Sequence, residues 1–202
     1  MRLKPPKFIR WLMPDLIWEM KDKSAVYLTF DDGPTPGITE WILSTLDKYD
    51  AKATFFVLGK NVEMYPDLYR RILDAGHRIG NHTYSHQKGW GMSLERYIED
   101  VDFANDLLHT ELFRPPYARI TPAQARALAM RYKLVMWDIL SRDYNRALSP
   151  RTCLRNVTRY LEGGSIVVFH DSEKSFRNMS YALPRTLQAV RAMGLKCKAI
   201  DL

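Results

Sequence analysis

Cysteine is scarce in this sequence, and its two cysteines, Cys153 and Cys197, lie too far apart for the spacing of a cysteine-based metal site. We therefore predict two free thiols, which fits a reducing compartment. Linkers rich in proline, glycine or serine, internal repeats and low-complexity runs are also missing. A chain of 202 residues without such dividers predicts one domain with a substantial core, over residues 25–202, preceded by a short extension over residues 1–24.

A clear secretory signal is also absent, because Pro14, Asp15 and Glu19 interrupt the apolar stretch near the N-terminus. The same stretch is too short and too polar to span a bilayer. It is nevertheless basic and rich in tryptophan, so residues 1–20 could form a helix that lies on an anionic membrane surface. The alternative is a helix that covers one end of the domain. A cytoplasmic protein, or one peripheral to the membrane, is the expectation that follows.

Acidic residues are fewer than basic ones, 23 against 30, which gives a formal net charge of +7. A positive surface favours anionic partners such as acidic glycans or lipid headgroups. No cluster of basic and aromatic residues matches a nucleic-acid-binding motif, so we expect no nucleic-acid partner.

What the sequence does contain is an alternation of short apolar runs and helix-like segments, which is typical of an α/β protein. Seven runs predict strands, at residues 25–30, 53–58, 78–81, 112–113, 134–137, 165–169 and 196–200. Helices are expected between them, at residues 39–49, 66–75, 93–109, 121–131, 150–161 and 181–193.

Polar residues follow these strands at the points where the strands end. They are Asp31 and Asp32, His82, Arg114, Asp138 or Asp143, and His170. In a β/α barrel the ends of the strands gather at one face, and the carboxyl edge of an open doubly wound sheet does the same. The sequence therefore predicts one site at that end of the fold.

Adjacent carboxylates and two histidines are the strongest chemical signal. A turn after a strand needs only one aspartate, yet Asp31 and Asp32 stand together before Gly33. His82 and His86 are four residues apart and would share one face of a helical turn. With Asp32 they would supply three protein ligands to a divalent ion and leave a position for water, as in a catalytic metal site.

Two later segments could complete a hydrolytic site. Arg114 could orient a neighbouring carboxylate by a bidentate contact, and the stiff Pro115-Pro116 pair could aim a backbone N–H at a developing oxyanion. His170 could protonate a leaving amine. Glycines on both sides of Trp90 predict a loop that lets the backbone approach the site.

In their order along the chain, these segments resemble the five motifs of the polysaccharide deacetylase family, the carbohydrate esterases with a NodB homology domain. The resemblance runs from about residue 25 to residue 202. The matching segments are Thr29–Gly33, His82–His86, Arg114–Tyr117, residues 140–144 and Val168–His170. The resemblance implies a distorted (β/α) barrel, usually of seven strands. It also implies a metal-dependent enzyme that hydrolyses the N-acetyl group of an N-acetylglucosamine-type unit in peptidoglycan or a chitin-like oligosaccharide.

The resemblance also implies a role for each matching carboxylate and imidazole. Asp31 is the general base, and Asp32, His82 and His86 hold a divalent metal, with zinc as the first expectation and cobalt or nickel as alternatives.

The remaining motifs imply supporting roles. Arg114 orients Asp31, the backbone N–H of Tyr117 helps to form the oxyanion hole, and Asp143 tunes His170, which is the general acid. The residues expected to line the substrate pocket are Pro116, Tyr144 and Val168.

Three positions depart from the family's motifs. Leu140 replaces an aspartate, Tyr144 replaces a tryptophan of the pocket wall, and Ala118 stands where glycine is common. These changes bear on substrate fit more than on reaction type. Three other functions stay open: a deacylase of a lipid-linked amino sugar at the cytoplasmic membrane face, a non-catalytic carbohydrate-binding relative, and a hydrolase of a small non-sugar amide.

Overall fold

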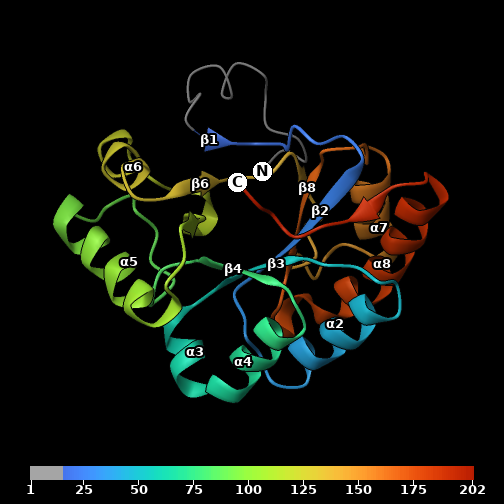
Figure 1. Ribbon diagram of the computed structural model, residues 1–202, viewed down its shortest axis with the longest axis horizontal. Helices are drawn as coiled ribbons and strands as arrows, with labels where there is room; N and C mark the ends of the chain where they lie inside the picture. The colour runs from blue at the N-terminus through green and yellow to red at the C-terminus, as the bar shows by residue number, and fades with distance from the viewer. Residues whose placement is uncertain (1–15) are drawn as a thin grey trace.

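The computed structural model describes residues 16–202, which contain a single parallel sheet wrapped by helices (Figure 1). The described strands follow the order β1-β6-β5-β4-β3-β2-β8-β7, with β9 paired to β2. Their bounds are β1 Leu16–Ile17, β2 Ala25–Asp31, β3 Thr54–Val57, β4 Arg78–Asn81, β5 Leu112–Phe113, β6 Lys133–Val135, β7 Ile139–Leu140, β8 Ile166–His170 and β9 Lys196–Cys197.

The helices connect these strands and cover the outside of the sheet (Figure 1). Their bounds are α2 Ile38–Asp47, α3 Gly59–Met64, α4 Pro66–Asp74, α5 Leu94–Leu108, the 3₁₀ turn η1 Pro116–Ala118, α6 Pro122–Ala129, α7 Pro150–Thr158 and α8 Glu173–Ala192. Parallel strands joined by helices bring all carboxyl ends of the strands to one face.

The sheet is curled into a half-barrel. Strand β6 lies near one end of the strand order and β7 at the other, yet only Met136–Asp138 separate them in the chain. So short a segment reaches at most about 14 Å, so the two ends of the sheet must approach each other. The distorted (β/α) barrel predicted from the sequence is thereby confirmed.

Strand β2 shows how the pleat separates the core from the site. Val26, Leu28 and Phe30 face the helices, and the Phe30 ring stacks 5.0 Å from that of Phe55. Because alternate side chains point to opposite faces, Thr29 and Asp31 point to the concave face of the sheet. Asp31 therefore arrives at the carboxyl end of the strand facing the interior of the barrel.

Several elements differ from the sequence-based expectation. The seven predicted strands are present, and the described residues add β1 and β7, which are each two residues long. Neither follows a predicted helix that would set it apart, whereas β5 and β9, which are equally short, do. Helix α8 begins at Glu173 rather than at residue 181, and α3 was not predicted.

The N-terminal extension is only partly described, because residues 1–15 lie outside the described residues. The helix expected within residues 1–20 of this extension is not found over residues 16–20. Instead, β1 pairs in parallel with β6, and Leu16 and Met20 are buried in the core. Burial of these two side chains against the sheet is the physical reason for the strand. Among residues 16–202, no helix is both long and apolar enough to cross a membrane.

Candidate active site

Asp32, His82 and His86 converge at the carboxyl ends of β2 and β4. Their ligand atoms all lie within 4.8 Å of one another. The Asp32 Oδ1 atom is 3.2 Å from His86 Nε2 and 3.7 Å from His82 Nε2. Asp32 has φ 82°, a left-handed conformation, and its carbonyl accepts a hydrogen bond of 2.8 Å from Asn61 Nδ2. The three side chains predicted to hold a metal are thus brought together.

Both histidine rings are oriented by partners on their other nitrogen. His82 Nδ1 lies 2.7 Å from the Arg114 carbonyl oxygen, and His86 Nδ1 lies 3.2 Å from the Tyr117 hydroxyl. Such contacts are typical of metal-ligating histidines because they fix the tautomer and leave Nε2 for the ion. Burial lowers the pKa of His82 to about 4, so this ring is neutral, which is the form that binds metal. The donor set fits a divalent ion.

The His82–His86 segment is an irregular loop, so the predicted helical turn is wrong. Strand β4 ends at Asn81, and both Thr83 and His86 have positive φ values, of 68° and 60°. The Asn81 side chain accepts a hydrogen bond of 2.8 Å from the Thr83 amide. Asp100 of α5 accepts a bond of 2.6 Å from the Ser85 hydroxyl. These side-chain contacts, rather than helical spacing, place the two imidazoles.

Asp31 is held by a wholly buried arginine. Arg114 Nη1 donates to Asp31 Oδ1 and to Thr29 Oγ1, both at 2.7 Å, while Nε and Nη2 donate to the carbonyls of Val135 and Met136. Arg114 therefore makes a single contact with the carboxylate, not the bidentate one predicted. The rest of the guanidinium is occupied by neighbours from β2 and β6, so it is locked in place.

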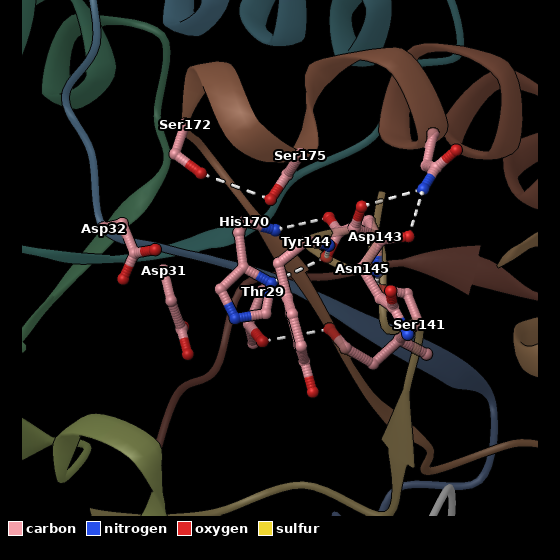
Figure 2. Close-up of polar contacts among 12 residues, drawn as sticks. Thr29, Asp31, Asp32, Ser141, Asp143, Tyr144, Asn145, His170, Ser172 and Ser175 are labelled. Carbon is pink, nitrogen blue, oxygen red and sulfur yellow. Dashed lines mark hydrogen bonds and ion pairs between the residues drawn. The ribbon is translucent and has the colours of Figure 1, made fainter. Parts of the chain in front are cut away.

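His170 is paired with Asp143 (Figure 2). Its Nδ1 lies 2.7 Å from Asp143 Oδ1, and its backbone N–H donates to Asp143 Oδ2, also at 2.7 Å. Burial alone would lower the pKa of His170, but the Asp143 charge and hydrogen bond outweigh it and raise the pKa to about 9. The imidazole is therefore protonated at neutral pH, as a general acid must be.

One cavity of about 820 Å³ is lined by Asp31, Asp32, His82, His86 and His170. Among the residues predicted for the pocket, Tyr144 and Val168 line it, and so does Leu140. Pro116 does not, and Pro115 lines the cavity in its place. Pro115 is extended, whereas Pro116 begins the turn η1, a difference that the sequence alone did not resolve.

Tyr117 stands in a left-handed conformation, with φ 59° and ψ 9°. Within residues 16–202 its amide N–H donates to no protein acceptor, and its side chain is exposed at the cavity. The turn η1 therefore leaves a free backbone donor at residue 117, the position predicted for the oxyanion hole.

A polysaccharide deacetylase family model matches residues 19–136, which is more than half of the chain. The chain belongs to this family. It is 35% identical over 158 residues to a peptidoglycan-N-acetylglucosamine deacetylase of Bacillus cereus, a match covering 75% of this chain and 57% of that protein. The chain thus spans little more than half of that relative.

Solved structures give the same picture of this deacetylase fold. A crystal structure of a peptidoglycan N-acetylglucosamine deacetylase superposes with a TM-score of 0.88 at 28% identity, covering 97% of this chain and 95% of that one. A pseudoenzyme of the same esterase family from Bacillus anthracis superposes with a TM-score of 0.82 at 25% identity, covering 92% and 67%. The family resemblance drawn from the motifs is confirmed.

The structure of this family member also shows supporting residues that sequence reasoning missed. Asp171 is buried against Gly33, where an added Cβ would lie 2.2 Å from its carboxylate. It accepts a bond of 2.6 Å from the Thr39 hydroxyl, and its amide donates to the Asp31 carbonyl at 2.7 Å. Asp171 therefore anchors the turn that carries both aspartates. In the sequence, only its position directly after His170 indicated that Asp171 lies at the site.

Asn178 is a second missed residue. Its side-chain amide, from α8, donates to the backbone carbonyls of Asp143 and Asn145 at 3.0 and 3.1 Å. The loop that supplies Asp143 is thereby fastened to α8. No motif indicates this role, and Asn178 also lies in the part of α8 that the sequence did not predict.

Proposed function

We propose that this protein is a metal-dependent deacetylase that hydrolyses the N-acetyl group of an N-acetylglucosamine-type unit in a glycan. The observation that carries the proposal is the meeting of three groups at one cavity. These are an arginine-held carboxylate at Asp31, the ligand set around Asp32, and a protonated His170. Family membership supports it. Because a pseudoenzyme shares the fold, the proposal rests on these residues rather than on the fold.

The ligand set favours zinc. Two imidazole nitrogens and one carboxylate oxygen are donors that zinc takes in catalytic sites, where a position stays open for water. Cobalt and nickel accept the same donors. When bound by Asp32, His82 and His86, such an ion supplies Lewis-acid polarisation of the amide carbonyl and a lower pKa for water.

The residues of the chain would divide the proton transfers between them. Asp31 takes a proton from the attacking water through Oδ2, because Oδ1 is engaged by Arg114. The free N–H of Tyr117 donates to the oxygen of the amide as negative charge develops there. His170 gives its Nε2 proton to the nitrogen as the C–N bond breaks. Acetate and a free amino sugar are the products.

Acetate release tests the proposal directly. The zinc-loaded protein should liberate acetate from chitooligosaccharides or peptidoglycan, with the amine appearing in equal amount. A protein that binds one divalent ion yet releases no acetate from either glycan would contradict it. That result would favour the small non-sugar amide or the non-catalytic relative instead.

Loss of either metal-ligating imidazole should abolish tight metal binding. We expect His82→Ala and His86→Ala to weaken zinc affinity by more than about 100-fold, since removing a partner of a ligand already costs roughly 10- to 100-fold. Competition with a chelator, followed by metal analysis of the protein, measures this. The matched control is His109→Asn at the exposed C-terminus of α5, where φ is 48° and asparagine is tolerated. If a His→Ala variant binds zinc as tightly as this control does, the histidine it lacks is not a metal ligand.

The pH profile should report the His170–Asp143 pair. A general acid with a pKa of about 9 makes kcat/KM fall as the pH rises through 9, since the imidazolium loses its proton. Asp143→Asn removes the charge that raises this pKa. The pH at which kcat/KM falls on the alkaline limb of the profile should therefore decrease by about two units or more, toward the ordinary histidine pKa of about 6.5. Rates between pH 5 and 10 measure the shift. An unmoved alkaline limb, with metal content unchanged, would show that Asp143 does not set it.

The N-terminal segment favours a second candidate, a deacylase of a lipid-linked amino sugar that is peripheral to the cytoplasmic membrane face. Residues 1–20 include Arg2, Lys4, Lys7 and Arg10 together with Trp11 and Trp18. Such a composition suits an anionic lipid surface. Deletion of residues 1–15 keeps β1 intact and should abolish cosedimentation with anionic liposomes. Equal binding of the deleted and intact chains would argue against membrane attachment.

A further inference from the structure

The positive charge of the chain is concentrated on two neighbouring helices, α7 and α8. Counting Arg159, which caps α7, they carry seven basic residues and a single acidic residue, Glu173. Their net charge is therefore +6, while the whole chain carries +7. A local excess of this size creates a positive potential that attracts anions from solution.

Six of these basic residues are arginines on the solvent-facing side of the two helices. Helices α7 and α8 pack against each other and bury their other sides, so their exposed sides form one surface (Figure 1). At about 100° per residue, the three arginines of each helix fall within about a third of a turn. We name this surface the arginine face. It consists of Arg151, Arg155, Arg159, Arg177, Arg185 and Arg191, all of which are exposed.

The guanidinium groups of the arginine face have no acidic partners. Among residues 16–202, no ion pair joins any of the six to a carboxylate. The guanidinium carbon of Arg185 lies 3.8 Å from the centre of the Tyr181 ring, and that of Arg159 lies 5.5 Å from the Tyr160 ring. Aromatic rings therefore support two of these groups and leave N–H donors for an anionic ligand.

Arginine favours phosphate as the anion. A guanidinium presents paired N–H donors that match two phosphate oxygens, and it keeps its charge throughout the physiological pH range. Arg151, Arg155 and Arg159 follow one another at intervals of one helical turn, over about 12 Å. A polymer with repeated phosphates can engage several of them at once, and each contact after the first is intramolecular. The arginine face therefore fits a chain of phosphates better than a single phosphate ion.

The arginine face lacks the side chains with which proteins enter bilayers or stack on nucleic-acid bases. Among the large hydrophobic side chains that are exposed in residues 16–202, none lies within α7 or α8. A surface that lies in a bilayer inserts such side chains, and single-stranded nucleic acids stack their bases on exposed aromatic rings. The observations thus favour a phosphate polymer that is met in water.

We propose that the arginine face binds a linear polymer that carries phosphate groups and holds the protein on that polymer. None of the six arginines lines the active-site cavity. This interaction surface is therefore separate from the catalytic groups, and the inference stands independently of the proposed deacetylase function.

Calorimetric titration with long-chain inorganic polyphosphate tests the proposal. The wild type should bind it with an affinity that falls steeply as salt is added. A triple variant, Arg151→Gln with Arg155→Gln and Arg159→Gln, should bind about 100-fold more weakly at about 0.1 M salt. The slope of log Kd against log salt should fall by about two, because each phosphate contact contributes roughly 0.7 to 0.9 to it.

The matched control combines Arg70→Gln, Arg96→Gln and Arg126→Gln, which remove the same charge from exposed positions on α4, α5 and α6. It should bind polyphosphate as the wild type does, and both triple variants should unfold within about 2 °C of the wild-type Tm. Equal weakening by the two triple variants would show that net charge alone drives binding, and would overturn the proposal. No binding by the wild type would overturn it as well.

Three further ligands test the chemistry of the polymer. Polyglutamate, anionic liposomes and a single-stranded oligonucleotide should each bind more weakly than polyphosphate at equal concentration of negative charge. Tighter binding of any of the three would assign the arginine face to carboxylates, to a membrane or to nucleic acid, and would overturn the proposal.

Discussion

The Asp31→Asn variant is expected to lose about a thousand-fold in kcat while keeping its bound metal. General base catalysis by a positioned side chain contributes typically 10²- to 10⁴-fold, and an amide cannot take the proton. The change leaves the ligand atoms of Asp32, His82 and His86 in place, because Asp31 is not among them. Acetate release from a chitooligosaccharide, together with metal analysis of the same preparation, measures both quantities.

The contrast with Asp32→Asn sharpens this experiment. The two aspartates are neighbours, so the same chemical change is made one residue apart. Asp32→Asn should weaken metal binding first and lose activity as a consequence, so that excess zinc restores part of the rate. Excess zinc should not restore Asp31→Asn. If Asp31→Asn stays fully active, or if zinc rescues it, the base lies elsewhere.

The Arg114→Met variant is expected to lower the free energy of unfolding by about 3–5 kcal/mol. Removing one partner of a buried ion pair costs this much because the other charge is left uncompensated. Here Asp31 would keep a buried carboxylate without its donor, and Thr29 and the Val135 carbonyl would lose theirs. For a chain of this size the loss corresponds to a fall in Tm of about 10 °C.

Thermal unfolding monitored by circular dichroism measures this loss, with Arg126→Met as the matched control. Arg126 is exposed on α6, so the same replacement there should change Tm by about one degree or less. Arg114→Lys should fall between the two, because an ammonium keeps the charge but not the guanidinium fork. Equal Tm values for Arg114→Met and Arg126→Met would mean that the buried pair contributes nothing to stability.

Much of the fold could be predicted because its longest elements carry strong local signals. The apolar run of β2 and the helix from Ser93 could be recognised without any partner, and the Ser93 hydroxyl does accept from the Arg96 amide. The short strands β1 and β7 could not be recognised in this way. Their identity depends on pairing with strands distant in the sequence, as in the register of Leu16 with Leu134.

The sequence by itself determined which chemistry is present. It supplies two adjacent carboxylates, two imidazoles four residues apart, and later an arginine and a histidine, each at the end of a strand. These residue types and their order are local properties, so they indicated the family and the ligand set.

Only the tertiary structure decided how each group is aimed. The His82 ring is oriented by the Arg114 carbonyl. Arg114 makes a single contact with Asp31 because its other N–H groups donate to other partners. The Trp90 indole N–H donates to the Ile120 carbonyl, which holds the ring in place. Each of these contacts joins residues about 30 or more positions apart, so no local pattern records it. The curl of the sheet brings them together, and that curl follows from the packing of whole strands.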